Sequence, residues 1–566
     1  MNRNTNAHFS EMPTAEIQRS TFDRSFSHKL SGNVGDVIPI FYDEILPGDT
    51  VQMSTSKIIR FQTMLTPVMD NIYADVYWFF VPNRLVWDHW EQLMGANYTS
   101  AWTPAAQYST PLIAVPPKAG VNDTPNNNKV GTILDYLGFP VEMSDQSANI
   151  EVSALPVRGY CKICNDWFLA ETVSDPINIY TGDNKVTATT EASYINDCPK
   201  GGVPFKAAKF HDYFTSCLPS PQRGDSVEIA VKSLTDKAPV YTWPTSLLSD
   251  DEKYYPLSAM GFVNSANTPA KYQLKRTSSS SSTALLEAVS GNNYSEITEA
   301  TYFAPSNLYV DPSSFTFTTN VNDLRYAFQL QKLLERDARG GCGRYIEIIK
   351  AHFNVNSPDQ RLQRSEYLGG NRFPVNITQV ANQAQAESEF LGDLGAFSVT
   401  GDTHDEFTKS FTEHGALYGL LVLRTDKTYS QGIPKYFKRS DRFSYYWPVF
   451  ANIGEQPVDK DEIYATATGT FGYQEAWASY RFRNNMCSGE MRPYVSNGLF
   501  SWTLADDYSE APTLSDGWIR EDKANVDRTL SVTSAVSHQF WADIYFNYKH
   551  TRPMPVFSIP GLIDHN

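Results

Sequence analysis

Apolar and polar residues alternate with a period of two over residues 72–81, which predicts a β-strand with a buried face. Phe79 and Val81 make the end of this segment apolar on both faces, as expected where a strand passes between two layers. A short apolar run at 417–422, bounded by glycine and charge, predicts a second buried strand. The first apolar face consists of Ile72, Ala74, Val76, Trp78 and Phe80.

Local signals also predict one turn and three helices. Leu-Pro-Gly-Asp at 46–49 predicts a sharp reversal, because proline presets φ and glycine allows positive φ. A short helix is expected over 83–95, with an asparagine as its N-cap, and another within 155–171. The clearest helical pattern covers 322–343, where apolar residues recur at spacings of three and four until a pair of glycines ends it.

Residues 230–307 lack strong apolar periodicity and are rich in Ser, Thr, Asn and Ala. Such a composition cannot build a core of its own, so it predicts an exposed insertion or a flexible linker. This segment includes a run of five serines: Ser278, Ser279, Ser280, Ser281 and Ser282.

The two ends of the chain differ in character. Residues 1–34 are polar, and Arg3, Arg19, Arg24 and Lys29 alternate there with acidic residues. This terminus is either poorly ordered or an arm whose cations contact phosphate groups. Residues 553–566 contain repeated prolines and are apolar, which predicts an extended arm without helix that a neighbouring chain covers.

Composition narrows the class of protein. Charged residues make up 19% of the 566 residues, and aromatic residues 13%. Low charge with many aromatics suits either a chain that buries much surface against other chains or one with a large aromatic core. The net charge of −16 excludes nucleic-acid binding by bulk attraction, so any such contact needs a local patch.

The sequence offers no membrane span, secretion signal, metal site or cofactor motif. No run of about 18 apolar residues is present, and the N-terminus has no apolar core, so synthesis in a cytoplasm is expected. The six cysteines are then reduced thiols. Cys161 and Cys164 suggest zinc, but Cys198 and Cys217 do not form the second close pair of a structural site, which favours buried thiols.

Catalytic motifs are also missing, so we expect no enzyme activity. There is no Gly-x-Ser-x-Gly elbow, His-Glu-x-x-His helix or Walker loop. Arg481, Arg483 and Arg492, interleaved with Tyr480 and Phe482, instead predict a basic-aromatic surface. This surface would contact nucleic acid or form salt bridges to a neighbouring subunit.

Several long segments resemble one protein family. IPIFYDEILPGDT followed by FFVPNRLVWDHWEQLMG is similar to the major capsid protein of the Microviridae, the small icosahedral single-stranded-DNA phages, and within them to the gokushovirus branch. The resemblance covers most of the chain except the insertion and the terminal twenty residues or so. It continues in the segments at 211–229, 324–341, 348–370, 413–434, 445–458 and 472–493.

This resemblance implies a mainly β fold: an eight-stranded antiparallel jelly roll with long inter-strand loops and a few short helices. The implied domains are an interior N-terminal arm at 1–34, a core at 35–229 and 308–552, and a surface insertion at 230–307. Residues 553–566 would form the C-terminal arm. The insertion would build a protrusion on the three-fold axis that serves host attachment.

The implied function is self-assembly into a T = 1 icosahedral shell around circular single-stranded DNA, in a virion assembled in the bacterial cytoplasm. Implied partners are further copies of the chain, a scaffolding protein, a small basic DNA-packing protein, a pilot protein and a host cell-surface receptor. The alternative is a secreted β-sandwich polysaccharide-binding protein or glycosidase. Aromatic content and glycosylation sequons favour it, and the missing signal peptide and paired carboxylates disfavour it.

Overall fold

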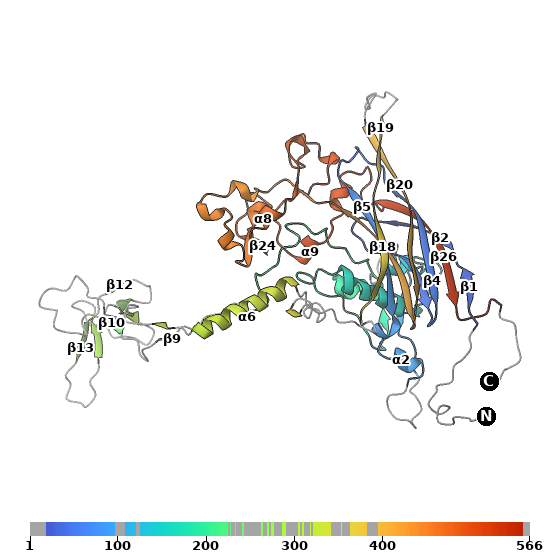
Figure 1. Cartoon of the computed structure of the whole chain (residues 1–566), viewed down its shortest axis with the longest axis horizontal. Coiled ribbons are helices and arrows are strands. Elements are labelled where there is room, and N and C mark those ends of the chain that lie inside the picture. Colours follow the sequence, from blue (N-terminus) through green and yellow to red (C-terminus); the bar gives the residue numbers. More distant parts are fainter. Residues whose placement is uncertain are drawn as a thin grey trace, which may run out of the picture. The chain divides into compact units, whose positions relative to one another are not determined.

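The computed structural model describes residues 18–96, 108–119, 125–224, 363–381 and 394–557, with shorter pieces between 227 and 353. The chain divides into two compact units. The larger unit comprises Met1–Arg223 and Glu335–Asn566, and the smaller one Gly224–Leu334. The larger unit contains two antiparallel sheets packed face to face (Figure 1).

The first sheet has six strands in the order β1-β26-β4-β20-β19, and β2 also pairs with β26. These strands are β1 (Ser20–Asp23), β2 (Phe26–Gly32), β4 (Thr50–Phe61), β19 (Ile377–Ala381), β20 (Leu394–Ser410) and β26 (Phe540–Arg552). The second sheet has four strands in the order β18-β5-β21-β3. They are β3 (Ile38–Ile45), β5 (Ile72–Pro82), β18 (Glu366–Pro374) and β21 (Gly415–Thr425). The mainly β, antiparallel fold class is thereby confirmed, and its architecture is consistent with a jelly roll.

From β2 to β5, successive strands alternate between the two sheets, so this part of the chain crosses the core repeatedly. The predicted turn at 46–49 is one of these crossings, since it leads from β3 in the second sheet to β4 in the first. The Asp49 backbone N–H donates to the Leu46 carbonyl oxygen at 3.0 Å, and Gly48 has a φ of 91°. The reversal is therefore confirmed, and its glycine occupies a conformation that L side chains rarely adopt.

The predicted strand pattern of β5 is confirmed on both faces. Trp78 and Phe80 belong to the core between the two sheets, where the Trp78 ring centroid lies 5.3 Å from that of Phe41. Phe79 and Val81 belong to a separate core on the other side of the second sheet. Helix α4 (Leu155–Ile163) packs there, so the second sheet is covered on both faces. The predicted buried run at 417–422 is likewise confirmed within β21.

The predicted helices are confirmed except for the first. Residues 83–95 form a 3₁₀ turn, η1 (Asn83–Leu85), and a separate α-turn, α2 (Trp90–Leu93), instead of one helix capped by Asn83. Tertiary hydrogen bonds interrupt the expected helix, because the Asp88 backbone N–H donates to Thr181 O at 3.0 Å. Helix α4 lies within 155–171, and α6 (Val321–Gly340) occupies the third predicted position.

Residues 20–32, within the predicted N-terminal arm at 1–34, belong to the first sheet. These residues form β1 and β2, and β2 pairs with β26 from Phe26↔Phe546 to Gly32↔Phe540. Phe26 and Leu30 pack toward the core, and His28 between them lies 2.8 Å from Ile40 O through Nδ1, whereas Ser27 and Lys29 are exposed on the opposite face. This alternation suits an edge strand despite the polar composition. Residues 1–17 lie outside the described part of the chain.

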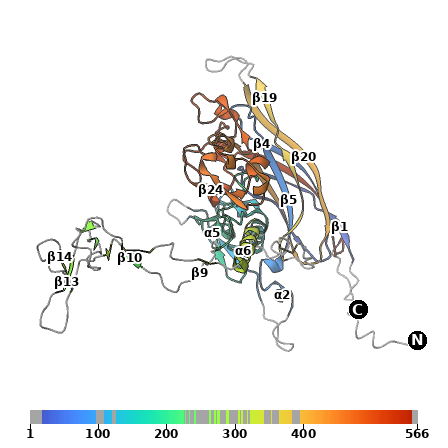
Figure 2. The ribbon, with the colours of Figure 1, turned by 60° about the vertical axis from the view of Figure 1, so that its left-hand side comes forward.

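The smaller unit extends beyond the predicted insertion on both sides. It contains short antiparallel pairs, among them β10 (Val240–Thr242) with β16 (Leu308–Val310) and β13 (Gln273–Arg276) with β14 (Leu286–Val289) (Figure 2). Because β16 pairs with β10, residues 308–310 belong to this unit and not to the core, which was predicted to resume at 308. The serine run 278–282 lies outside the described residues.

Asp36 lies between β2 and β3 and makes the stability of the fold depend on pH. It is buried, and burial raises its pKa to about 6, although Lys206 and Lys523 oppose this rise. A raised carboxyl pKa contributes stability that is complete below the unfolded pKa near 4 and disappears as the pH rises through 6. Relative to Asp36→Asn, the wild type should lose about 3 kcal/mol of unfolding free energy between pH 4 and 7. Urea denaturation of both proteins checks this, and parallel pH profiles would contradict it.

Candidate functional site

The connection between β21 and β26 forms a surface built from short helical turns. They are η6 (Lys435–Phe437), η7 (Arg442–Ser444), η8 (Pro448–Phe450) and α8 (Ala478–Arg481). The Asp441 carboxylate caps η7 by accepting the backbone N–H groups of Phe443 and Ser444, both at 2.8 Å. Turns of this length have no broad inner face, so several of their apolar side chains point outward.

Apolar side chains gather on this connection in unusual number. Val449 is 88% exposed and Phe443 is 67% exposed. We define the aromatic surface as Tyr436, Phe437, Phe443, Tyr445, Tyr446, Trp447, Val449, Tyr480 and Phe482, all of them exposed. Contiguous exposed apolar side chains mark an interaction site, because monomers rarely leave such patches in water.

Arginine side chains lie over the rings of the aromatic surface. The Arg439 guanidinium carbon is 4.0 Å from the Tyr480 ring centroid, and that of Arg442 is 4.8 Å from the Trp447 ring centroid. Arg439 also donates to Ser479 Oγ at 3.2 Å. These cation–π contacts hold the guanidinium groups in place beside apolar area, a combination common at the centre of protein interfaces.

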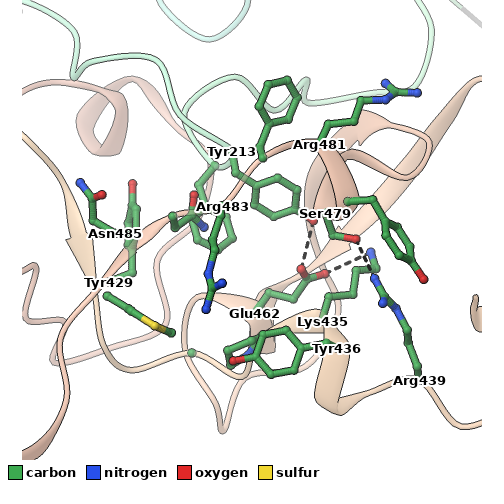
Figure 3. Close-up of a pocket in the computed structure, with 17 residues that line it drawn as sticks. Tyr213, Tyr429, Lys435, Tyr436, Arg439, Glu462, Ser479, Arg481, Arg483 and Asn485 are labelled. Carbon is green, nitrogen blue, oxygen red and sulfur yellow. Dashed lines mark hydrogen bonds and ion pairs between the residues drawn. The ribbon is translucent and has the colours of Figure 1, made fainter.

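A pocket of about 360 Å³ opens beside these residues (Figure 3). Lys435, Arg439, Arg481 and Arg483 line it, against a single lining carboxylate, Glu462. The buried Glu462 accepts a hydrogen bond from Tyr213 at 3.0 Å and lies 3.2 Å from Lys435 Nζ. Burial and this carboxylate together raise the pKa of Tyr213, so the phenol stays a donor. The pocket therefore has excess positive charge.

The predicted basic-aromatic residues are only partly brought together. Arg481 and Arg483 line the pocket, and Arg481 is ion-paired with Glu475. Arg492 does not line it and instead donates to Tyr494 Oη at 2.9 Å. Sequence reasoning missed Lys435 and Arg439, although the interleaving of basic and aromatic residues over 435–447 carries the same signal.

The residues predicted to contact DNA differ in the interactions that their side chains already make. Arg3 lies outside the described residues. Arg19 donates to Thr50 Oγ1 at 3.0 Å, and Arg24 forms an ion pair with Asp43. The Lys29 side chain is 72% exposed, and its Nζ lies 3.4 Å from Asp543.

The four cysteines considered as zinc ligands are buried thiols, as their spacing favoured. Cys161, Cys164, Cys198 and Cys217 are buried, and none of them forms a disulfide. Burial raises the pKa of Cys161 and Cys164 well above the ordinary value and that of Cys198 to about 12, so these groups remain protonated. Within the described residues, no group of three or more His, Cys, Asp or Glu side chains could hold a metal ion.

Comparison with known proteins identifies the family. A family described as "Capsid protein (F protein)" matches residues 10–562. Capsid protein VP1 of Chlamydia phage 1 is 35% identical over 98% of this chain and 97% of its own length. Capsid protein VP1 of Bdellovibrio phage phiMH2K is 36% identical over 98% and 97%, and that of Spiroplasma virus 4 is 34% identical over 94% and 93%.

These relatives are structural proteins of the virion, so the glycosidase alternative is set aside and the chain is not an enzyme. Among the helices within the described ranges, none combines the length and apolar character needed to cross a membrane. The antiparallel sheets, the exposed aromatic surface and the matches over nearly the whole length agree with one another. The chain therefore belongs to the phage capsid protein (F protein) family, within the gokushovirus branch of the Microviridae.

Proposed function

We propose that this capsid protein assembles into a T = 1 icosahedral shell that encloses circular single-stranded DNA. The observation that carries the proposal is the aromatic surface, whose side chains are too apolar and too exposed for an isolated chain. Repeated contacts between identical subunits that close around symmetry axes would cover this surface on every copy.

Charge supports a second copy as the occupant of this surface. The chain carries a net charge of −16, whereas the pocket lining has four cations against one carboxylate. A surface with excess positive charge is therefore complementary to much of the remaining surface of an identical neighbour. Aromatic and arginine side chains are also the residue types that contribute most to protein interfaces.

The C-terminal segment would take part in the same contacts. Val556 and Phe557 follow β26 and are exposed, and residues 558–566 lie outside the described part of the chain. We propose that a neighbouring copy covers 553–566, because an apolar extended segment is unfavourable in water.

Electron microscopy and size-exclusion chromatography of the purified chain test the proposal. Closed particles of one size should form, either from the chain alone or when the other phage proteins are co-expressed. A chain that remains a monomer under all these conditions would contradict it.

Packaging requires further partners in this proposal. A chain with net charge −16 cannot neutralise a genome by itself, so a small basic DNA-packing protein would supply the missing cations. The scaffolding protein and the pilot protein complete the proposed set of phage partners.

The insertion at 230–307 would form the protrusion that meets a host cell-surface receptor. Its β13-β14 hairpin pairs only with itself among the described strands, so it can be removed without opening another pair. Excising residues 271–293, which include the serine run, should leave particle yield unchanged and reduce adsorption to host cells several-fold. Particle counts and adsorption assays measure the two effects.

An insertion of unchanged length, with glycine in place of residues 278–282, is the matched control. Loss of particles on excision would place the hairpin in the shell. Undiminished adsorption would place the receptor contact elsewhere.

A further inference from the structure

Among the described residues, no layer packs on the outer face of the first sheet as helix α4 and its neighbours do on the second sheet. Along β26 the residues alternate strictly between buried and exposed from Phe540 to His550. Two aromatic rings point outward from it, with Trp541 44% exposed and Tyr545 49% exposed. Ile58 on β4 and Phe397 on β20 are also exposed on this sheet. Exposed aromatic residues on an open sheet are functional candidates, since a structural role would bury them.

Strand register arranges the exposed residues in rows across the sheet. Trp541 lies opposite Arg60. In the next outward-facing row, Asp543 lies between Ile58 on β4 and Lys29 on β2. Tyr545 follows one row further on. The two rings are four residues apart on one strand, a separation of about 13 Å, and the lysine lies in the row between them.

Two hollows lie side by side on this face. One has a volume of about 520 Å³ and is lined by Trp541 and Arg60, among others. The other has a volume of about 510 Å³ and is lined by Tyr545 and Ser56, among others. Lys29, Ile58 and Asp543 line both. Each hollow therefore has an aromatic ring and Lys29 in its lining, together with two carboxylates: Asp543 in both, Asp135 in the first and Asp402 in the second.

Two cations on this face are available to an incoming anion. Arg60 forms no hydrogen bond or ion pair with any residue in the described ranges. Lys29 Nζ lies 3.4 Å from Asp543, but both side chains are largely exposed. A surface pair of this kind contributes little, so a phosphate can compete for the ammonium group.

We propose that this sheet face binds single-stranded DNA. Bases stack on Trp541 and Tyr545, while Lys29 and Arg60 contact the phosphates between and beside them. Stacking on aromatic rings of an open sheet, with cations along the backbone path, is how several single-strand-binding domains hold their ligand. The inference rests on the proposed function, since it names the surface of the shell protein that faces the genome.

Anisotropy of a fluorescein-labelled oligo-dT of about twenty nucleotides tests the binding. Trp541→Ala and Tyr545→Ala should each weaken binding roughly tenfold, the loss of one stacked base. Trp541→Phe should bind nearly as the wild type, because it keeps a ring. Both alanine variants should remain folded, since the removed side chains face solvent.

Salt dependence gives an independent readout. With two phosphates contacted, log K should fall against log salt with a slope of about −1.4. Lys29→Ala should make this slope shallower by about 0.7. Asn547→Ala, on the same strand and face, is the matched control and should leave affinity and slope unchanged.

The outcomes separate this inference from the proposed function. In one outcome the wild type forms shells and the alanine variants bind oligo-dT as tightly as the wild type. This outcome would overturn the inference, and the proposed shell function would stand. Variants that bind normally but no longer assemble would also overturn it, since a second copy would then cover the face. A wild-type chain that binds oligo-dT but never forms shells would overturn the proposed function alone.

Discussion

Replacing Phe443 and Val449 with aspartate is expected to give a folded chain that forms no closed particles. Both side chains belong to the aromatic surface and are exposed in the isolated chain, so its stability should change by no more than about 0.5 kcal/mol per site. In a shell each aspartate would be an unpaired charge buried in an apolar contact, which costs about 3–5 kcal/mol. Every copy repeats this cost. Electron microscopy and circular dichroism measure the two properties.

Val536→Asp is the matched control for this experiment, because Val536 is also strongly exposed but lies outside the aromatic surface. It should assemble normally. Normal particles from the double variant, or equal loss from the control, would show that the aromatic surface is not the contact between subunits.

Lys57→Met is expected to reduce the free energy of unfolding by about 3–5 kcal/mol. Lys57 and Glu406 are both buried, and Nζ lies 2.9 Å from Glu406 Oε1. Thr55 also donates to this carboxylate. Removing the ammonium group leaves Glu406 charged and without its principal partner inside the sandwich. Urea denaturation measures the loss.

The double variant Lys57→Met with Glu406→Leu should recover most of this stability, because both buried charges are then removed. Lys29→Met is the control for replacing a lysine with methionine. Because the ion pair of Lys29 with Asp543 is exposed, the free energy of unfolding should change by no more than about 0.5 kcal/mol. A double variant as unstable as the single one would mean that packing around Lys57, and not its charge, is responsible.

Local features of the fold could be read directly from the sequence. The alternation over 72–81 placed Trp78 and Phe80 in one core and Phe79 and Val81 in another, as the structure confirms. This succeeds because successive side chains of a strand point to opposite faces whatever the strand pairs with. The turn at 46–49 and helix α6 were also predictable, because adjacent residues determine each of them.

The candidate site was predictable only in part. Arg481 and Arg483 are close in sequence to the aromatic residues that flag them, so their surface could be predicted. Lys435 and Arg439 reach the same pocket from an earlier turn of the connection. No local pattern shows that two turns about forty residues apart share a pocket, because this depends on how the connection folds back on itself.

By itself, the sequence determined the mainly β class, the individual strands and turns, the family resemblance and the existence of a basic-aromatic surface. Tertiary structure decided which segments meet. It made residues 20–32 part of a sheet by pairing them with β26, and it covered one sheet while leaving Trp541 and Tyr545 in solvent. It also gave Lys57 its buried partner on β20. The physical reason is that side-chain direction is set by adjacent backbone, whereas pairing between distant strands and the covering of a face depend on the whole chain.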